Sequence, residues 1–263
     1  MELLKYPRTR HIQGSSLQKG DEDLSAVDFS RIAGRNIVVE EKFDGANSAI
    51  SYAQDRSQLL QSRGHYLQGG LREKHFDLMK QWAAVHSKSL FEVLGTRYIC
   101  FGEWMFAKHT IFYDQLPHYW LEFDIFDRHK SVFLSTSERL KLLKLLPVSS
   151  VRVLFEGKLN SYKELTALVG RSGYISDEHL DKLKKQASSL GLAEEQILKE
   201  TEKTYLMEGL YIKVEEDGIV KERYKYVRSG FLNAVFDSES HWLNRPILPN
   251  ILREGVNIYD SSS

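Results

Sequence analysis

Residues 40–47 read Glu40-Glu41-Lys42-Phe43-Asp44-Gly45-Ala46-Asn47 and separate two segments with strand character. Apolar, β-branched residues at 37–39 precede the octet, and an alternating segment at 48–52 follows it. This pattern predicts a strand, a tight turn that Gly45 makes sharp, and a second strand. A lysine is ordinarily a solvated surface group. Lys42, however, is flanked by three carboxylates, and a lysine amine tuned by its neighbours and by burial can act as a nucleophile.

The composition is that of a globular protein with a sizeable core. The chain has 263 residues, 42% of them hydrophobic, and its 36 basic residues balance its 36 acidic ones. Nucleic-acid binding would therefore depend on local basic patches, not on bulk charge. The single cysteine, Cys100, excludes a disulfide framework. We expect a cytoplasmic protein that has no membrane partner, because neither a signal peptide nor a membrane span is evident. We also expect a monomer.

Further along the chain, helical and strand patterns alternate. Strands are predicted at 97–105, 120–127, 148–155, 206–214 and 220–227, and an amphipathic helix at 72–85. Ser135 with Glu138, and Ser161 with Glu164, have the spacing of helix capping boxes. Residues 160–203 are charged and helical, which favours a solvated insertion. The mixture predicts an α+β fold.

Two segments leave alternatives open. Glu103 lies in an apolar strand, so it is either paired in a salt bridge or faces a polar site. The basic residues Arg8, Arg10 and His11 lie in an N-terminal segment, which is either a plain extended arm or a phosphate-facing edge of a site.

The octet resembles the K-x-D-G motif of the covalent nucleotidyltransferases, which are DNA ligases, RNA ligases and mRNA capping enzymes. In those enzymes the lysine attacks the α-phosphate of a nucleotide. Such chemistry needs carboxylates for a divalent metal, cations for the phosphates and an apolar slot for the purine. All three appear in this chain, in order, on separate predicted strands.

The wider pattern resembles the ATP-dependent RNA ligase family, including its bacterial stand-alone members, over most of residues 6–231. The matching segments are K-F-D-G at 42–45 with Asn47, S-R-G at 62–64, F-G-E-W at 101–104, F-D-I-F-D at 123–127 and E-G-L-Y-I-K at 208–213. The final K-x-K motif departs from the family pattern, since the chain reads Arg223-Tyr224-Lys225. We assign the α-phosphate contact to Lys225, while Arg223 or Arg228 could share it.

This resemblance implies a role for each matching residue. The implied catalytic residues are Lys42, Asp44, Glu208 and Lys225. The implied cofactor-binding residues are Glu40, Glu41, Asn47, Arg63, Glu103, Phe123, Lys213 and Arg228. Glu103 and Glu208 would also bind metal, and Arg8, Arg10 and His11 would contact nucleic acid.

The resemblance also implies a fold and a reaction. The fold would be a nucleotidyltransferase domain, with mostly antiparallel sheets around an ATP cleft. We expect a single domain over 1–263, with a helical insertion at about 160–203 and no OB-fold. The reaction would use ATP and Mg²⁺ or Mn²⁺ to join RNA ends through lysyl-AMP. The alternatives are a DNA nick ligase, a GTP-dependent capping-type enzyme and a non-catalytic nucleotide-binding module.

Overall fold

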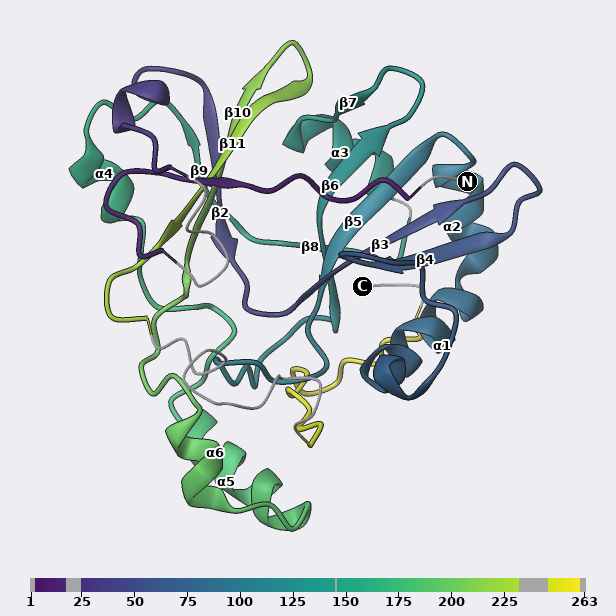
Figure 1. The fold of residues 1–263 in the computed structure, drawn as a ribbon, viewed down its shortest axis with the longest axis vertical. Helices are drawn as coiled ribbons and strands as arrows, with labels where there is room; N and C mark the ends of the chain where they lie inside the picture. The colour runs from purple at the N-terminus through teal and green to yellow at the C-terminus, as the bar shows by residue number, and fades with distance from the viewer. Residues whose placement is uncertain (1–2, 18–24, 145, 232–245, 261–263) are drawn as a thin grey trace.

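The octet at residues 40–47 joins two β-sheets. The computed structural model describes residues 3–17, 25–144, 146–231 and 246–260. Strand β2 (Ile37–Lys42) belongs to a five-stranded sheet and β3 (Ala46–Tyr52) to a six-stranded sheet. The strand, turn and strand predicted here are confirmed, and residues 43–45 cross from one sheet to the other (Figure 1).

The five-stranded sheet contains the first residue of the K-F-D-G motif, Lys42, and nearly all of the last two motifs predicted from the sequence. Its order is β1 (Arg10–His11), β11 (Ile219–Val227), β10 (Gly209–Glu216), β2 and β9 (Val153–Gly157). Only the pairing of β1 with β11 is parallel. The 3-10 helix η1 (Phe29–Arg31) and helix α4 (Tyr162–Thr166) pack on this sheet through Phe29 and Leu165. Ser161 caps α4 as predicted, because its side chain accepts from the Glu164 amide, while the Glu164 carboxylate accepts from the Asn160 amide.

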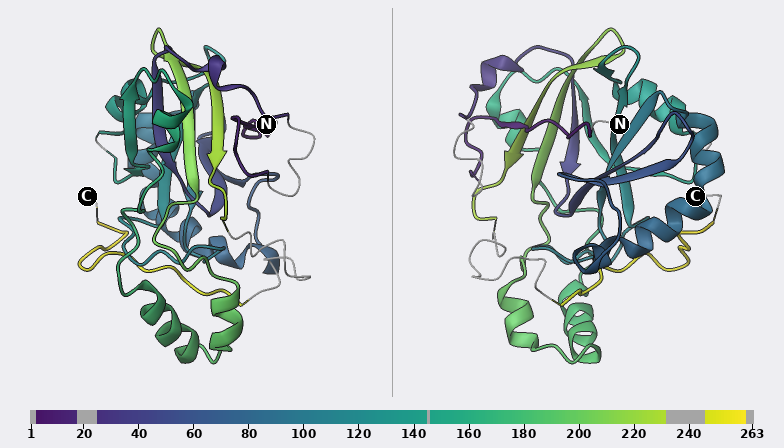
Figure 2. Two further views of the ribbon diagram at one scale, coloured as in Figure 1. Left: turned by 90° about the vertical axis from the view of Figure 1, so that its left-hand side faces the viewer. Right: turned by 45° about the vertical axis from the view of Figure 1, so that its right-hand side comes forward.

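The six-stranded sheet carries the aromatic core. Its order is β4 (Gln58–Ser62), β3, β5 (Tyr98–Trp104), β6 (Trp120–Asp127) and β7 (Val132–Phe133), with β8 (Ser149–Ser150) parallel to β6. The 3-10 helix η2 (Leu71–Phe76) leads into α1 (Asp77–Val85) and α2 (Ser87–Leu94). These helices cover one face of the sheet (Figure 2), where Trp82 and Trp120 are fully buried. Helix α3 (Thr136–Leu143) begins at the predicted cap Ser135.

One prediction made from local pattern differs from the structure. The apolar run 148–155 is not one strand, because β8 pairs in one sheet and β9 in the other, and residues 151–152 cross between them. Gly45 makes the predicted bend, and it does so without a left-handed conformation. A Cβ at Gly45 would instead lie 2.6 Å from the Met105 sulfur and 2.9 Å from the Trp104 carbonyl oxygen, so the need there is for close approach.

The predicted helical segment divides into two parts. Helix α4 belongs to the core of the five-stranded sheet, whereas α5 (His179–Ser189) and α6 (Glu194–Lys199) form a hairpin beyond both sheets (Figures 1 and 2). Leu183 and Ala187 of α5 bury against Phe112 and Leu248. The division into one domain with an insertion at about 160–203 stays a prediction.

The α+β class with mostly antiparallel sheets is confirmed. Residues 246–260 have no helix or strand, yet Asn250 is buried and its side chain donates to the Met105 carbonyl oxygen at 2.6 Å. Within the described residues, we find no helix with the length and apolar character that a membrane span needs.

Candidate active site

A cavity lies between the two sheets, where residues 43–45 cross. It encloses about 770 Å³ when its open mouth is included. Register places Glu40, Tyr211 and Lys225 side by side across β2, β10 and β11. The full lining is Tyr6, Pro7, Thr9, Glu40, Glu41, Lys42, Phe43, Asn47, Arg63, Glu103, Phe123, Val151, Tyr211 and Lys225.

Lys42 forms an ion pair at this cavity. Its Nζ donates to both carboxylate oxygens of Glu208, each at 2.7 Å. Glu208 is buried directly before β10, and the register of Gly209 with Lys42 brings the two side chains together. Burial alone would lower the pKa of Lys42, but the carboxylates of Glu208, Glu103 and Asp44 outweigh it and raise that pKa. Lys42 is therefore protonated in the structure, and its ammonium group is held by the Glu208 carboxylate.

Glu103 faces the cavity from the opposite sheet. It lies opposite Asn47 in the pairing of β5 with β3, and its Oε1 accepts from the Gly45 amide at 3.2 Å. Burial, with the nearby carboxylates of Glu208 and Asp44, raises the pKa of Glu103 to about 8. Of the two alternatives for this residue, the structure favours the polar site. Among the described residues, no group of three or more His, Cys, Asp or Glu side chains forms a metal cage.

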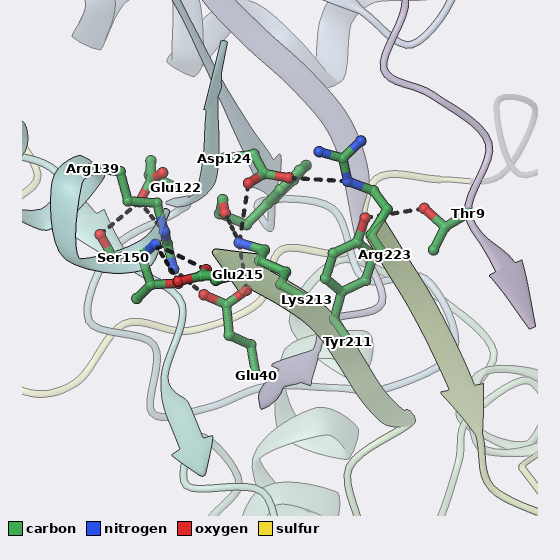
Figure 3. A network of polar contacts seen from close by, with 12 residues as sticks. Thr9, Glu40, Glu122, Asp124, Arg139, Ser150, Tyr211, Lys213, Glu215 and Arg223 are labelled. Carbon is green, nitrogen blue, oxygen red and sulfur yellow. Dashed lines mark hydrogen bonds and ion pairs between the residues drawn. The ribbon is translucent and has the colours of Figure 1, made fainter. Parts of the chain in front are cut away.

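A buried ion network lies beneath the cavity (Figure 3). Arg139 from α3 contacts Glu122 of β6 at 2.5 Å and also Glu40 of β2. Lys213 of β10 pairs with Glu40 at 3.0 Å and with Asp124 of β6 at 3.2 Å. The network spans both sheets, so it fixes their relative position at the cavity floor. Its contacts also explain why the fully buried Lys213 is not among the lining residues.

Glu41 carries a carboxylate oxygen that is not satisfied. Its Oε1 accepts from the Ser172 hydroxyl, while its buried Oε2 has no hydrogen-bond partner in the described part of the chain. Burial raises the pKa of Glu41 to about 7. A buried acceptor without a donor is costly, which disfavours the ionised form of this carboxyl.

The N-terminal arm forms part of the cavity wall, which agrees with one of the two alternatives that the sequence left open for it, an edge of the site. The Tyr6 ring packs edge-on against Phe123, with ring centroids 5.1 Å apart. The Tyr6 hydroxyl donates to Asp124 and lies 2.6 Å from the Tyr211 hydroxyl, which also contacts Thr9 at 3.0 Å. Strand alternation within β10 was the one signal for Tyr211, since it shares a face with Lys213. The sequence marked the arm that carries Tyr6, Pro7 and Thr9, but it did not mark these three residues as candidates, and it did not mark Val151.

The remaining candidate residues divide by position. Asn47, Arg63 and Lys225 line the cavity, and Arg63 is exposed at its mouth. Asp44 lies beside it and accepts from the amides of Thr110 and Ile111 at 2.6 and 2.9 Å.

The three cations of the last motif separate clearly. Lys225 lines the cavity. Arg223 lies next to Asp124 in the buried network, at 3.7 Å. Arg228 lies elsewhere, because its guanidinium contacts Glu202 at 2.8 Å and the Met207 carbonyl oxygen at 2.9 Å. The structure does not bring Arg228 to the cavity.

The three basic residues of the N-terminal arm differ in their exposure to solvent. Arg8 and Arg10 are exposed, whereas His11 is fully buried beside the Ser15 hydroxyl at 2.6 Å. The backbone alternates sides along β1, and the side that carries His11 packs into the protein. The structure therefore does not place His11 where nucleic acid could reach it.

Solved structures of an RNA ligase share this fold. A Naegleria gruberi RNA ligase variant solved with ATP and Mn aligns at 20% identity with a TM-score of 0.51, over 88% of this chain and 62% of that one. The same ligase with pyrophosphate aligns at 21% identity with a TM-score of 0.52, over 90% of this chain and 64% of that one. The chain thus spans less than two thirds of the length of these ligases. At such identity the likeness establishes the fold.

Comparison by sequence assigns the family. No curated protein matches the chain significantly. The family model described as RNA ligase matches residues 35–227, which include every strand from β2 to β11. The chain belongs to the RNA ligase family.

Proposed function

We propose that the chain is an ATP-dependent RNA ligase that joins 5′-phosphate and 3′-hydroxyl ends through lysyl-AMP and 5′-adenylylated RNA. The observation that carries this proposal is Lys42, whose amine lies at the cavity and is held by Glu208 at 2.7 Å. In the first step, Lys42 Nζ attacks the α-phosphorus of ATP and pyrophosphate leaves. AMP then passes to the RNA 5′-phosphate, and a 3′-hydroxyl displaces it.

The first step requires the unprotonated amine of Lys42. The ion pair with Glu208 opposes this, because it raises the pKa of the amine. Glu208 and Glu103 offer the oxygen ligands that Mg²⁺ prefers, and Mg²⁺ commonly needs only one or two carboxylates beside substrate phosphates. The two residues therefore fit such a cation even without a complete protein cage. When bound, it would offset phosphate charge and compete with Lys42 for Glu208.

Adenine selectivity follows from Glu41. An ionised carboxylate only accepts hydrogen bonds, and its unpartnered Oε2 suits the exocyclic amine of adenine. Guanine presents a carbonyl oxygen at the equivalent edge, which the same oxygen would repel. We infer that Phe123 stacks on the base, and that Lys225 contacts the α-phosphate. The ligase structures with ATP and Mn support the choice of nucleotide and metal.

The polynucleotide would approach the open mouth. Arg63 is exposed there, and Arg8 and Arg10 are exposed on the arm whose Tyr6 and Thr9 line the cavity. We propose these cations as phosphate contacts for RNA. Arg8→Ala should spare lysine adenylylation and weaken sealing, and equal loss of both steps would argue against this assignment.

The test separates the first step from the last. Lys42→Ala should form no lysyl-AMP from ATP, yet it should still seal RNA that carries a preformed 5′-adenylyl group. Wild-type protein should seal 5′-phosphorylated RNA and not the equivalent DNA nick. Preference for DNA would favour the nick-ligase alternative, and labelling from GTP in place of ATP would favour a capping-type enzyme. ATP binding without any covalent adduct or sealing would favour the non-catalytic module.

A further inference from the structure

One loop between β5 and β6 holds Asp44 in place. His109 Nδ1 lies 3.9 Å from Asp44 Oδ1, and residues 110–113 make three hydrogen bonds with Asp44. The amides of Thr110 and Ile111 donate to Asp44 Oδ2 at 2.6 and 2.9 Å, and the Asp44 amide donates to the Tyr113 hydroxyl at 3.2 Å. Asp44 is the middle residue of the crossing 43–45, so this loop fixes the segment that follows Lys42.

The helical hairpin holds this loop from one side through Asp114. That carboxylate is 1% exposed. Lys182 Nζ of α5 donates to its Oδ2 at 2.7 Å, and the Ser176 amide donates to its Oδ1 at 2.7 Å. Lys182 is the charge that balances this buried aspartate, and removing one partner of such a pair leaves a costly unpaired charge.

The end of the hairpin holds the same loop from a second side. Lys108 Nζ donates to the Glu200 carbonyl oxygen at 3.0 Å, and the Glu202 amide donates to the Thr110 carbonyl oxygen at 2.9 Å. Thr110 therefore connects Asp44 to the hairpin, because the Thr110 amide donates to Asp44 and the Thr110 carbonyl oxygen accepts from the Glu202 amide. Arg228 anchors this end through its ion pair with Glu202 at 2.8 Å.

We propose that the α5–α6 hairpin positions Lys42 for adenylylation, with Lys182 as a positioning residue that acts through Asp114 and loop 110–113 on Asp44. This inference rests on the proposed function, because it gives the hairpin a part in that reaction. An attacking amine must be held in line with its phosphorus, and a misplacement of about 1 Å can cost on the order of a hundredfold in rate. Removing the Lys182 ammonium therefore affects the chemistry although this side chain does not touch the nucleotide.

The kinetic test compares two charge-removing variants on the same helix. Lys182→Met should lower the single-turnover rate constant of adenylylation at saturating ATP by about tenfold or more. The ATP concentration for half-maximal rate should change less than about twofold, since Lys182 is not among the residues that line the cavity. Lys182→Arg should restore most of the rate. Lys184→Met, which removes a surface partner of Asp181, should behave as wild type.

A second readout works without ATP. Hydrogen exchange at the Thr110 and Ile111 amides should be faster in Lys182→Met than in wild type, and unchanged in Lys184→Met. Should Lys182→Met fail to fold, combining it with Asp114→Asn removes both charges of the pair and serves in its place.

Each outcome decides a separate claim. A normal rate or unchanged exchange in Lys182→Met overturns the positioning role. A wild-type protein that takes no label and carries no AMP beforehand contradicts the proposed function. Exchange at Thr110 and Ile111 then decides only whether the hairpin is coupled to Asp44.

Discussion

Replacing Arg139 by methionine should strongly destabilise the fold. The Arg139 side chain is fully buried and contacts Glu122 at 2.5 Å as well as Glu40. Without it, Glu40 keeps Lys213 at 3.0 Å, but Glu122 keeps, among the described residues, one side-chain hydrogen bond, from the Ser150 hydroxyl at 2.7 Å. Breaking a buried pair in this way costs about 3–5 kcal/mol. For a chain of this size, that corresponds to a fall in Tm of about 6–20 °C.

The stability lost in Arg139→Met should depend on pH in a defined direction. Burial raises the pKa of Glu122, and Arg139 acts against that rise. Removing Arg139 raises this pKa further, so the folded variant favours the protonated acid. The destabilisation should be largest above the folded pKa of Glu122 and should shrink as the pH falls through it. Glu122→Gln in the same background should recover much of the loss.

Thermal unfolding followed by circular dichroism measures both effects. The matched control is Lys141→Met on the same helix, whose 72% exposed side chain pairs with Glu138. That change should cost less than about 0.5 kcal/mol. An Arg139→Met loss no larger than the Lys141→Met loss, or one independent of pH, would refute the reasoning.

Three further changes have expected outcomes. Gly102→Ala should cost about 1–3 kcal/mol in chemical denaturation, because its Cβ would lie 2.5 Å from the Trp120 ring; wild-type stability would contradict that packing. Ser135→Ala should cost about 1 kcal/mol through loss of the α3 cap, which the same measurement checks. In calorimetry with Lys42→Ala, ATP affinity should rise from about pH 6 to pH 8 as the carboxyl of Glu41, with its pKa of about 7, ionises. Adding Glu41→Gln should flatten that dependence, and a persistent slope would exclude Glu41 as its source.

Local patterns predicted the elements that local physics determines. Strands β2 and β3 follow from alternation and β-branching, and the caps Ser135 and Ser161 follow from their spacing to a glutamate. The prediction of a single strand over residues 148–155 was wrong, because periodicity alone does not record that Val151 begins a crossing between sheets.

The supporting contacts could not be predicted, because they join distant segments. Arg139 and Lys182 have the sequence context of a solvated helix face, yet one is fully buried and the other pairs with a buried aspartate. Tyr6 reaches Asp124 across 118 positions. Such contacts exist only after the two sheets pack together, so no sequence window contains them.

The central claim is that Lys42 becomes covalently adenylylated. The most direct measurement incubates the protein with Mg²⁺ and ATP labelled on its α-phosphate, then maps the label by peptide mass spectrometry. We predict a single AMP adduct on Lys42 that is absent from Lys42→Ala, with the intact mass of untreated protein showing any AMP already bound. A wild-type protein that carries AMP neither before nor after incubation, or carries it on another residue, would contradict the account.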